Sequence, residues 1–149
     1  MTGETWDAAP HEPMLGNVPL TVRTARLSYA GADRLDIARA SCGPDGEPFA
    51  PSWDILLPIL ALRRSDARAL EAAWPKYAAD YTAEMRASYR RKRAAWDALL
   101  ARPAVVLVCY CTDPARCHRR VLAELLAKLG AVDLGEVARA PAPQMGLAL

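Results

Sequence analysis

Three cysteines and a histidine lie close together in this chain, at Cys109, Cys111, Cys117 and His118. A thiol that loses its proton becomes a nucleophile, and a neighbouring imidazole can accept or return that proton. Thiolates and imidazoles are also the ligands that zinc prefers. This group of residues therefore predicts either a site with a reactive thiol or a metal site.

The first hypothesis is a reactive thiol beside a site for phosphate. Cys117 and His118 fall at the start of an expected helix, where free backbone N–H groups attract anions and lower the pKa of a thiol. Cys117 would be the nucleophile, His118 the general acid or base, and Asp36 a carboxylate partner from the other end of the chain. The residues expected to bind the substrate, with the arginines as phosphate clamps, are Arg26, Tyr29, Cys109, Cys111, Arg116 and Arg119.

The spacing of these residues excludes one familiar class of thiol enzyme. The Cys-x5-Arg loop of cysteine phosphatases would require an arginine at position 117 after Cys111, or at position 115 after Cys109. Those positions hold Cys117 and Ala115. The site is therefore not a phosphatase loop of that type.

The second hypothesis is a metal site formed by Cys109, Cys111, Cys117 and His118. A Cys3His set suits zinc, and three thiolates suit an iron–sulfur cluster. Cys109 and Cys111 would share one face of a strand, but Cys117 and His118 are adjacent, whereas zinc ligands are usually separated by two to four residues. On this ground a metal-free site is favoured, and zinc or an iron–sulfur cluster remains the alternative.

A purely structural role is the third interpretation. A free cysteine is among the most buried residue types, and a histidine on an apolar stripe is commonly a hydrogen-bonded core residue. The convergence of four such residues near an arginine favours a functional pocket instead. Cys42 lies alone in a turn-rich loop and is interpreted as incidental.

The elements that position these residues can be predicted from the apolar pattern. A continuous apolar run predicts a buried strand over residues 104–110, and a stripe from Val121 to Leu129 predicts a helix over 117–129 that ends at Gly130. The stripe extended backwards places Cys117 and His118 toward the sheet, with Arg119 and Arg120 on the flank or the outside. Ligands tend to bind at the carboxyl end of such a strand.

The rest of the chain fits a single α/β domain over residues 20–137, with an irregular arm at 1–19 and a loose tail at 138–149. Further strands are expected over 20–27, 34–39 and 132–137. Helices are expected over 53–64 with a kink at Pro58, over 67–73, and over 75–100. The prediction is a small, mostly parallel, Rossmann-like sheet flanked by helices.

Composition excludes several classes of protein. Hydrophobic residues make up 52% of the 149 residues, which excludes a disordered chain. No apolar run approaches the roughly 18–20 residues of a membrane helix, and the N-terminus lacks the pattern of a signal peptide. We therefore expect no membrane partner and a cytoplasmic, reducing location in which the cysteines are thiols or metal ligands.

A basic run on the long expected helix is a second candidate for function. At helical spacing, Arg86, Arg90 and Arg93 share a side with Tyr89, which would suit contact with a phosphate backbone. Acidic residues lie close by, and the net charge is only +2. Nucleic-acid binding through this patch is therefore an alternative to a catalytic pocket.

Several separated motifs together resemble the domain-of-unknown-function 488 family, in the branch found in phages and bacteria. They occur in the family's order over about residues 20–137, and they are Thr24-Ala25-Arg26 with Tyr29 and Gly31, Asp33-Arg34-Leu35-Asp36-Ile37, Phe49-Ala50-Pro51-Ser52-Trp53, the region of Tyr77 and Tyr81, Leu107-Val108-Cys109-Tyr110-Cys111, Cys117-His118-Arg119 with Leu122 and Leu125, and Gly135-Glu136. Ala38 departs from the pattern, because that branch often has a threonine there. The resemblance implies a family without an assigned activity.

These observations lead to one hypothesis and one alternative. We expect an enzyme that acts on a nucleotide or nucleic acid through a Cys/His/Arg pocket where strand 104–110 meets helix 117–129, as in base modification or phage–host defence. The alternative is a non-catalytic module that binds nucleic acid or a protein partner and whose Cys/His group is structural. The reaction and the oligomeric state do not follow from the sequence.

Overall fold

A computed structural model describes residues 18–111 and 113–138 of the chain. The predicted arm 1–19 and tail 138–149 lie almost entirely outside the described residues. The elements, in chain order, are β1 (Thr21–Arg26), β2 (Arg34–Asp36), α1 (Gly43–Gly46), a 3-10 turn (Glu47–Phe49), α2 (Trp53–Ser65), α3 (Ala67–Arg91), α4 (Arg93–Leu100), β3 (Ala104–Cys109), a second 3-10 turn (Pro114–Arg116), α5 (His118–Lys128) and β4 (Val132–Glu136).

The four strands form one parallel sheet in the order β2-β3-β1-β4. β3 pairs with β1 and with β2, and every residue of β3 after Ala104 is buried, as its continuous apolar sequence predicts. β3, α5 and β4 form the expected β-α-β unit, with β1 inserted between its two strands. The predicted α/β class and parallel sheet are thereby confirmed.

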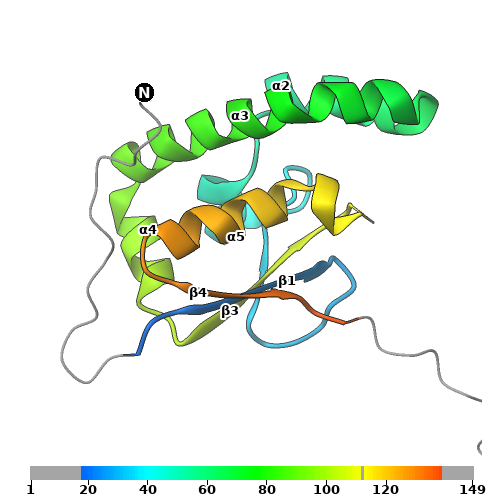
Figure 1. Ribbon diagram of the computed structural model, residues 1–149. Helices are drawn as coiled ribbons and strands as arrows, with labels where there is room; N and C mark the ends of the chain where they lie inside the picture. The colour runs from blue at the N-terminus through cyan, green and yellow to red at the C-terminus, as the bar shows by residue number, and fades with distance from the viewer. Residues whose placement is uncertain (1–17, 112, 139–149) are drawn as a thin grey trace, which may run out of the picture.

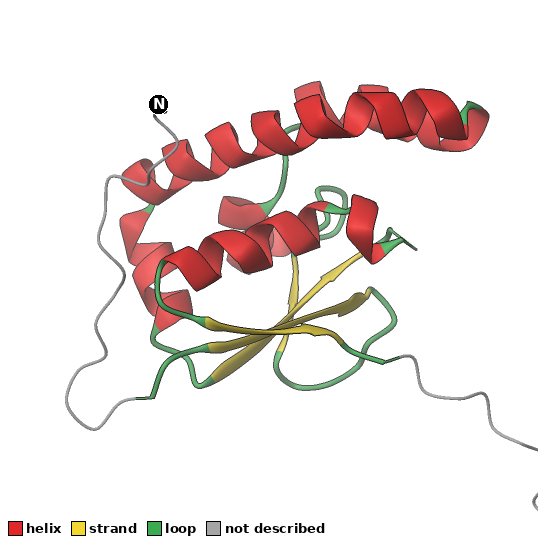
Figure 2. Ribbon diagram, viewed as in Figure 1, coloured by secondary structure: helices red, strands yellow, loops and turns green. Residues whose placement is uncertain are grey.

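The described helices cover only one face of this sheet (Figure 1; Figure 2). α5 lies directly on the strands, and α3 lies above α5 with α2 packed against it. The main core lies between sheet and helices, where Leu107 and Val22 meet Leu122 and Tyr81. A Rossmann arrangement carries helices on both faces, so the Rossmann-like part of the prediction is not confirmed.

A loop rather than a helix covers part of the opposite face. Ala25, Val106 and Val108 are buried there, and the partly buried Leu27 and Tyr29 from the segment after β1 pack against them. This connection joins β1 to β2 and passes beneath the sheet (Figure 1). This face of the sheet is therefore partly covered by the loop between β1 and β2, and no helix connects these two strands.

The helix boundaries differ from the prediction at Pro75 and at Lys92, whereas α2 contains Pro58 as expected. α2 contains Pro58 and α3 contains Pro75, and neither helix ends there. Residues on both sides of Pro75, including Trp74 and Tyr77, pack against α2, and this packing outweighs the lost backbone hydrogen bond. The long helix instead ends before Lys92, whose backbone is not helical, and α4 follows as a separate helix.

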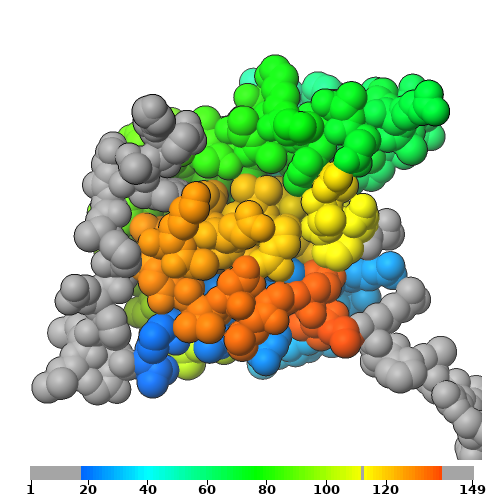
Figure 3. Space-filling view, in the orientation of Figure 1, coloured from blue at the N-terminus to red at the C-terminus, as the bar shows by residue number. Residues whose placement is uncertain are grey.

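None of the described helices is both long enough and apolar enough to cross a lipid bilayer. The space-filling view shows α3 stacked on α5, with β4 beneath them (Figure 3).

Arg119 in the first turn of α5 is fully buried, although the helical pattern places it on the flank or outside. Its Nε and Nη2 donate to the two carboxylate oxygens of Glu136 on β4, at 3.1 and 2.8 Å. Its Nη1 donates to the carbonyl oxygen of Cys111 at 2.9 Å. Charge pairing and complete hydrogen bonding offset the cost of burying the guanidinium, and the arginine joins β4 to the loop after β3.

We expect Arg119→Met to lower the free energy of unfolding by about 3 kcal/mol, because it leaves Glu136 without its partner and the Cys111 carbonyl unsatisfied. Arg120→Met is the matched control, since Arg120 pairs with Asp133 on the same strand but is partly exposed. Its loss should be about 1 kcal/mol or less. Urea denaturation measures both values, and equal losses would contradict the assigned role of Arg119.

The same pair predicts a dependence of stability on pH. Burial would raise the pKa of Glu136, but hydrogen bonds from Arg119 and Thr24 outweigh it and hold the pKa below its ordinary value of 4.5. Such a carboxylate stabilises the fold above its unfolded pKa, and this contribution is lost as the pH falls through the folded value. The difference in unfolding free energy between the wild type and Arg119→Met should therefore shrink as the pH is lowered below 4.5. A difference that stays constant with pH would argue against this origin.

Candidate functional site

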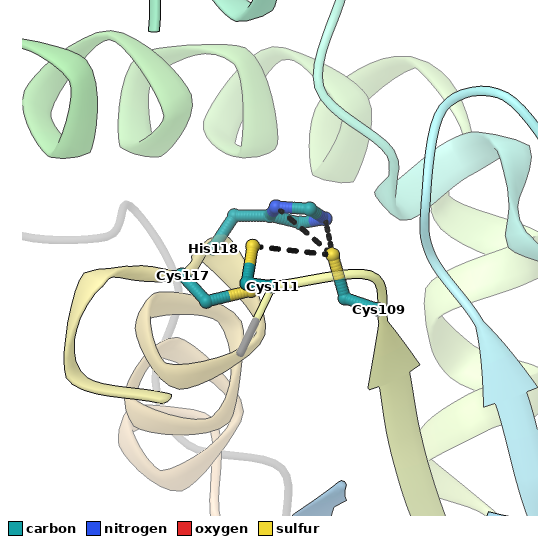
Figure 4. Close-up of side chains that lie close together, drawn as sticks. All are labelled: Cys109, Cys111, Cys117 and His118. Carbon is teal, nitrogen blue, oxygen red and sulfur yellow. Dashed lines mark hydrogen bonds between the residues drawn. The ribbon is translucent and has the colours of Figure 1, made fainter. Parts of the chain in front are cut away.

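Cys109, Cys111, Cys117 and His118 converge at the carboxyl end of β3, and we call them the Cys/His cluster (Figure 4). Cys109 is the last residue of β3, and Cys111 lies two residues further along the loop. His118 begins α5, and Cys117 precedes it with an extended backbone, at φ −140° and ψ 144°. The four side chains therefore lie close together, as the sequence predicts.

The polar atoms of the cluster lie close to one another. The sulfur of Cys109 is 3.7 Å from the sulfur of Cys111, and it is 3.8 and 3.6 Å from Nδ1 and Nε2 of His118. The three cysteine sulfurs and a ring nitrogen of His118 all lie within 4.8 Å of one another. None of the four residues is more than 5% exposed, so the cluster is nearly dry.

The ring of His118 is held in place by backbone outside the cluster. Its Nε2 lies 2.8 Å from the carbonyl oxygen of Ile37, the residue after β2. A carbonyl only accepts hydrogen bonds, so Nε2 carries the proton and Nδ1 is left as the acceptor. Burial lowers the pKa of His118, which keeps the ring neutral.

The three thiols of the cluster have unlike proton affinities. Hydrogen bonds from Cys111 and Cys117 outweigh burial and lower the pKa of Cys109 to about 3. The pKa of Cys111 is raised, chiefly by its hydrogen bond to Cys109, and burial raises the pKa of Cys117. The prediction of a lowered pKa at Cys117 is therefore wrong, because its thiol is fully enclosed beside a better-stabilised thiolate at Cys109.

Asp36, the expected carboxylate partner of His118, forms its hydrogen bonds elsewhere. The carboxylate of Asp36 accepts hydrogen bonds from the backbone N–H of Ala38 and the hydroxyl of Ser41, at 2.8 and 2.6 Å. It shapes the turn that presents the Ile37 carbonyl, and no hydrogen bond joins it to His118 among the described residues. Asp36 thus positions the histidine's acceptor without touching the ring.

The arginines and the tyrosine of the predicted site do not converge on the cluster, and each has contacts of its own. Arg26 pairs in register with Cys109, on the same face of the sheet. Arg116 forms an ion pair with Glu71 of α3. The hydroxyl of Tyr29 donates to Asp33 at 2.7 Å. Arg119 faces Glu136 and the Cys111 carbonyl, so the structure brings together only the cysteines and the histidine.

A cavity of about 70 Å³ opens over the cluster. Cys109, Cys111 and His118 contribute to its lining, and Cys117 does not. The remaining lining residues are Ala38, Arg39, Ala40, Trp53, Leu56, Leu60, Arg63 and Tyr110. The three accessible members of the cluster are thus reached past residues of α2 and of the loops after β2 and β3.

The α2 side of this cavity is not among the residues predicted from the sequence, although the sequence contains a signal for it. Trp53, Leu56, Leu60 and Arg63 follow each other at intervals of three, four and three residues, which places them on one face of a helix. That face carries a tryptophan that is 46% exposed and an arginine at its end. Only the tertiary structure shows that this face meets the cluster.

The basic run does not lie on one helix. Arg86 and Arg90 belong to α3, but the break at Lys92 places Arg93 at the start of α4. Arg93 bonds to Asp97 and its guanidinium lies 4.4 Å from the centre of the Tyr89 ring. The expected common side of a single helix is therefore wrong. Arg86 instead lines a separate hollow of about 490 Å³ between α3 and α5, which contains no member of the cluster.

The fold and the site define a small α/β protein with a buried Cys3His group at the carboxyl end of its central strand. Residues 22–130 match the family DUF488-N3a, described as an active DUF488-N3 subclade, and the chain belongs to this family. The matched span contains the whole cluster, so the resemblance found in the sequence is confirmed. Comparisons with curated proteins and with solved structures found no match.

Burial predicts how the four cysteines react with a thiol reagent. Cys42 lies outside the cluster and is partly exposed, whereas the other three are buried. We expect iodoacetamide to label Cys42 at least about tenfold faster than any cysteine of the cluster in the native protein. Peptide mass spectrometry over a time course measures the rates, with urea-denatured protein as the control. Faster labelling of Cys109 or Cys111 would show that the cavity admits the reagent freely.

Proposed function

We propose that the protein is an enzyme that acts on a nucleotide or nucleic acid at the cavity over the Cys/His cluster. The observation that carries this proposal is the composition of the cavity, in which two arginines and two aromatic side chains surround sulfur and imidazole groups. The description of the matched family as an active subclade agrees with a catalytic site. The arginines support a phosphate group in the proposed substrate, and the aromatic residues support a base.

The arginines support a substrate that carries negative charge. Arg63 of α2 forms no hydrogen bond or ion pair with any other described residue, although it lines the cavity. Arg39 also lines the cavity, and its guanidinium lies 3.8 Å from the carboxylate of Glu47 and donates to the sulfur of Cys42. A guanidinium without a protein partner beside a cavity is suited to bind phosphate through paired hydrogen bonds.

The aromatic residues support a substrate with a flat ring. Trp53 is 46% exposed and Tyr110 is 57% exposed, and both line the cavity. Exposed aromatic rings beside arginines are typical of surfaces on which bases stack. Leu57, one turn after Trp53, is also exposed and extends this apolar surface along α2.

The size of the cavity limits what can enter it. Sites that enclose a whole small ligand usually measure about 300–1,000 Å³, whereas this cavity measures about 70 Å³. One group of the substrate would enter, and the rest would lie on the surface formed by Trp53, Leu57 and Tyr110. The candidate reacting groups are the sulfurs of Cys109 and Cys111 and the imidazole of His118, because these residues line the cavity.

Matched arginine variants test the proposal. Calorimetry would measure binding of inorganic phosphate, a nucleoside, a nucleoside monophosphate and a short single-stranded DNA. We expect Arg63→Ala to weaken binding of the phosphate-bearing probes by about tenfold or more, because a hydrogen bond to a charged group contributes about 1.5–3 kcal/mol. The neighbouring Arg64→Ala, on the exposed side of α2, should change binding less than about twofold.

Two outcomes would count against the proposal. Equal weakening by both variants would indicate general attraction of anions by the surface. Unchanged binding in Arg63→Ala, with loss in a variant that replaces Arg86, Arg90 and Arg93 by alanine, would favour the non-catalytic alternative with a nucleic-acid surface elsewhere.

A further inference from the structure

We propose that the Cys/His cluster binds one zinc ion through the sulfur atoms of Cys109, Cys111 and Cys117 and through Nδ1 of His118. This inference goes beyond the proposed function. If Cys109, Cys111 and His118 bind zinc, they act as ligands at the lining of the cavity and not as free reacting groups, while the test of zinc binding does not require a nucleotide. The inference also reverses the preference for a metal-free site that the sequence alone favours.

The donor atoms select the class of metal. Three thiol sulfurs and one imidazole nitrogen form a soft donor set that suits zinc, whereas calcium and magnesium require oxygen ligands. The group of potential ligand atoms within 4.8 Å contains no carboxylate. The set therefore matches the Cys3His type of zinc site.

The contacts of the Cys109 sulfur match the spacing of ligands around one ion, and the four ligand atoms as a group lie within 4.8 Å of one another. Bonds of about 2.3 Å to sulfur and about 2.0–2.1 Å to nitrogen separate tetrahedral ligand atoms by about 3.6–3.8 Å. The sulfurs of Cys109 and Cys111 are 3.7 Å apart, and the sulfur of Cys109 is 3.8 Å from Nδ1 of His118. A Rieske-type iron–sulfur centre requires two histidines on one iron, and the ligand group found among the described residues contains one histidine, His118.

The surroundings orient the histidine as a metal ligand requires. A ligating histidine usually donates its other ring N–H to a backbone carbonyl or carboxylate, which fixes the ring and its tautomer. The contact between Nε2 of His118 and the Ile37 carbonyl, at 2.8 Å, provides this second bond. Nδ1 is then the nitrogen left to bind a metal, and it lies 3.8 Å from the sulfur of Cys109, which is close to both ring nitrogens (Figure 4).

The adjacency of Cys117 and His118 is not an obstacle in this fold. Cys117 has extended backbone angles as the residue before α5, while His118 is already helical. The change of conformation between the two residues directs both side chains to the same centre, as the close-up shows (Figure 4). Two neighbours within a regular helix would instead point about 100° apart.

The protein environment also suits the charge of such a site. Zinc with three thiolates and a neutral histidine carries a net charge of −1. The guanidinium of Arg119 donates to the carbonyl of Cys111, and Arg63 lines the cavity beside Cys111. Positive groups therefore lie next to the ligands on two sides.

The test is the metal content of the full-length, untagged protein. It would be expressed with zinc in the medium, purified without chelator and measured by plasma mass spectrometry. We expect about one zinc per chain in the wild type and in Cys42→Ser, the matched control for removal of a cysteine outside the cluster. Cys117→Ser should retain less than about one-tenth of this zinc.

A second measurement on the wild type keeps the proposal testable if Cys117→Ser does not fold. Cobalt(II) added to metal-free protein should produce the visible and near-ultraviolet absorption of a tetrahedral thiolate site, and zinc should abolish it stoichiometrically. A folded wild-type protein that holds neither zinc nor cobalt would overturn the proposal, and so would stoichiometric iron with sulfide. None of these outcomes depends on nucleotide binding, so failure of this proposal and failure of the proposed function are distinguishable.

Discussion

The structure depends on how it satisfies the polar atoms buried at the carboxyl end of β3. Buried polar groups are costly unless each finds a partner, and here the partners come from different strands. The ring of His118 bonds to the carbonyl of Ile37 after β2, and Arg119 bonds to Glu136 on β4. The side chain of Thr24 on β1 donates to the same carboxylate. The first turn of α5 is thereby hydrogen-bonded to the segments after β2 and β3 and to β4, and through Glu136 it is linked to β1.

The placement of all described helices on one face of the sheet explains why a cavity exists at this point. α5 begins at the cluster and runs back along the sheet, so it does not cover its own start. α3 packs over α5 and carries α2 with it, through contacts that include Leu56 and Tyr77. One face of α2 thus reaches the cluster and forms the arginine and tryptophan wall of the cavity.

The most regular patterns in the sequence predicted the fold best. The continuous apolar run of β3 and the periodic stripe of α5 are strong signals, and extending that stripe backwards placed His118 correctly near the end of β3. Arg119 was misplaced on the outside, because the pattern of one helix does not show that Glu136 and the Cys111 carbonyl complete its hydrogen bonds. The continuation of α3 through Pro75 likewise depends on packing against α2.

The cavity walls could not be predicted in the same way. Trp53 and Arg63 lie more than forty residues before the cluster in the sequence, and their meeting with it depends on how the helices stack. The conformation of Cys117 is also a local detail that decides a chemical question, since regular helix geometry would separate its side chain from that of His118. Periodicity located the element and its face, but not this one residue.

The proximity of the three sulfurs itself limits their chemistry. Like charges a few ångströms apart in a dry site cannot all persist, so without a cation one thiolate at Cys109 is stabilised by two protonated neighbours. Arg119 cannot relieve this repulsion alone, because Glu136 already shares its charge. A divalent cation removes the repulsion and allows all three thiols to ionise together. The number of thiolates beneath the cavity is therefore set by whether a cation occupies the cluster.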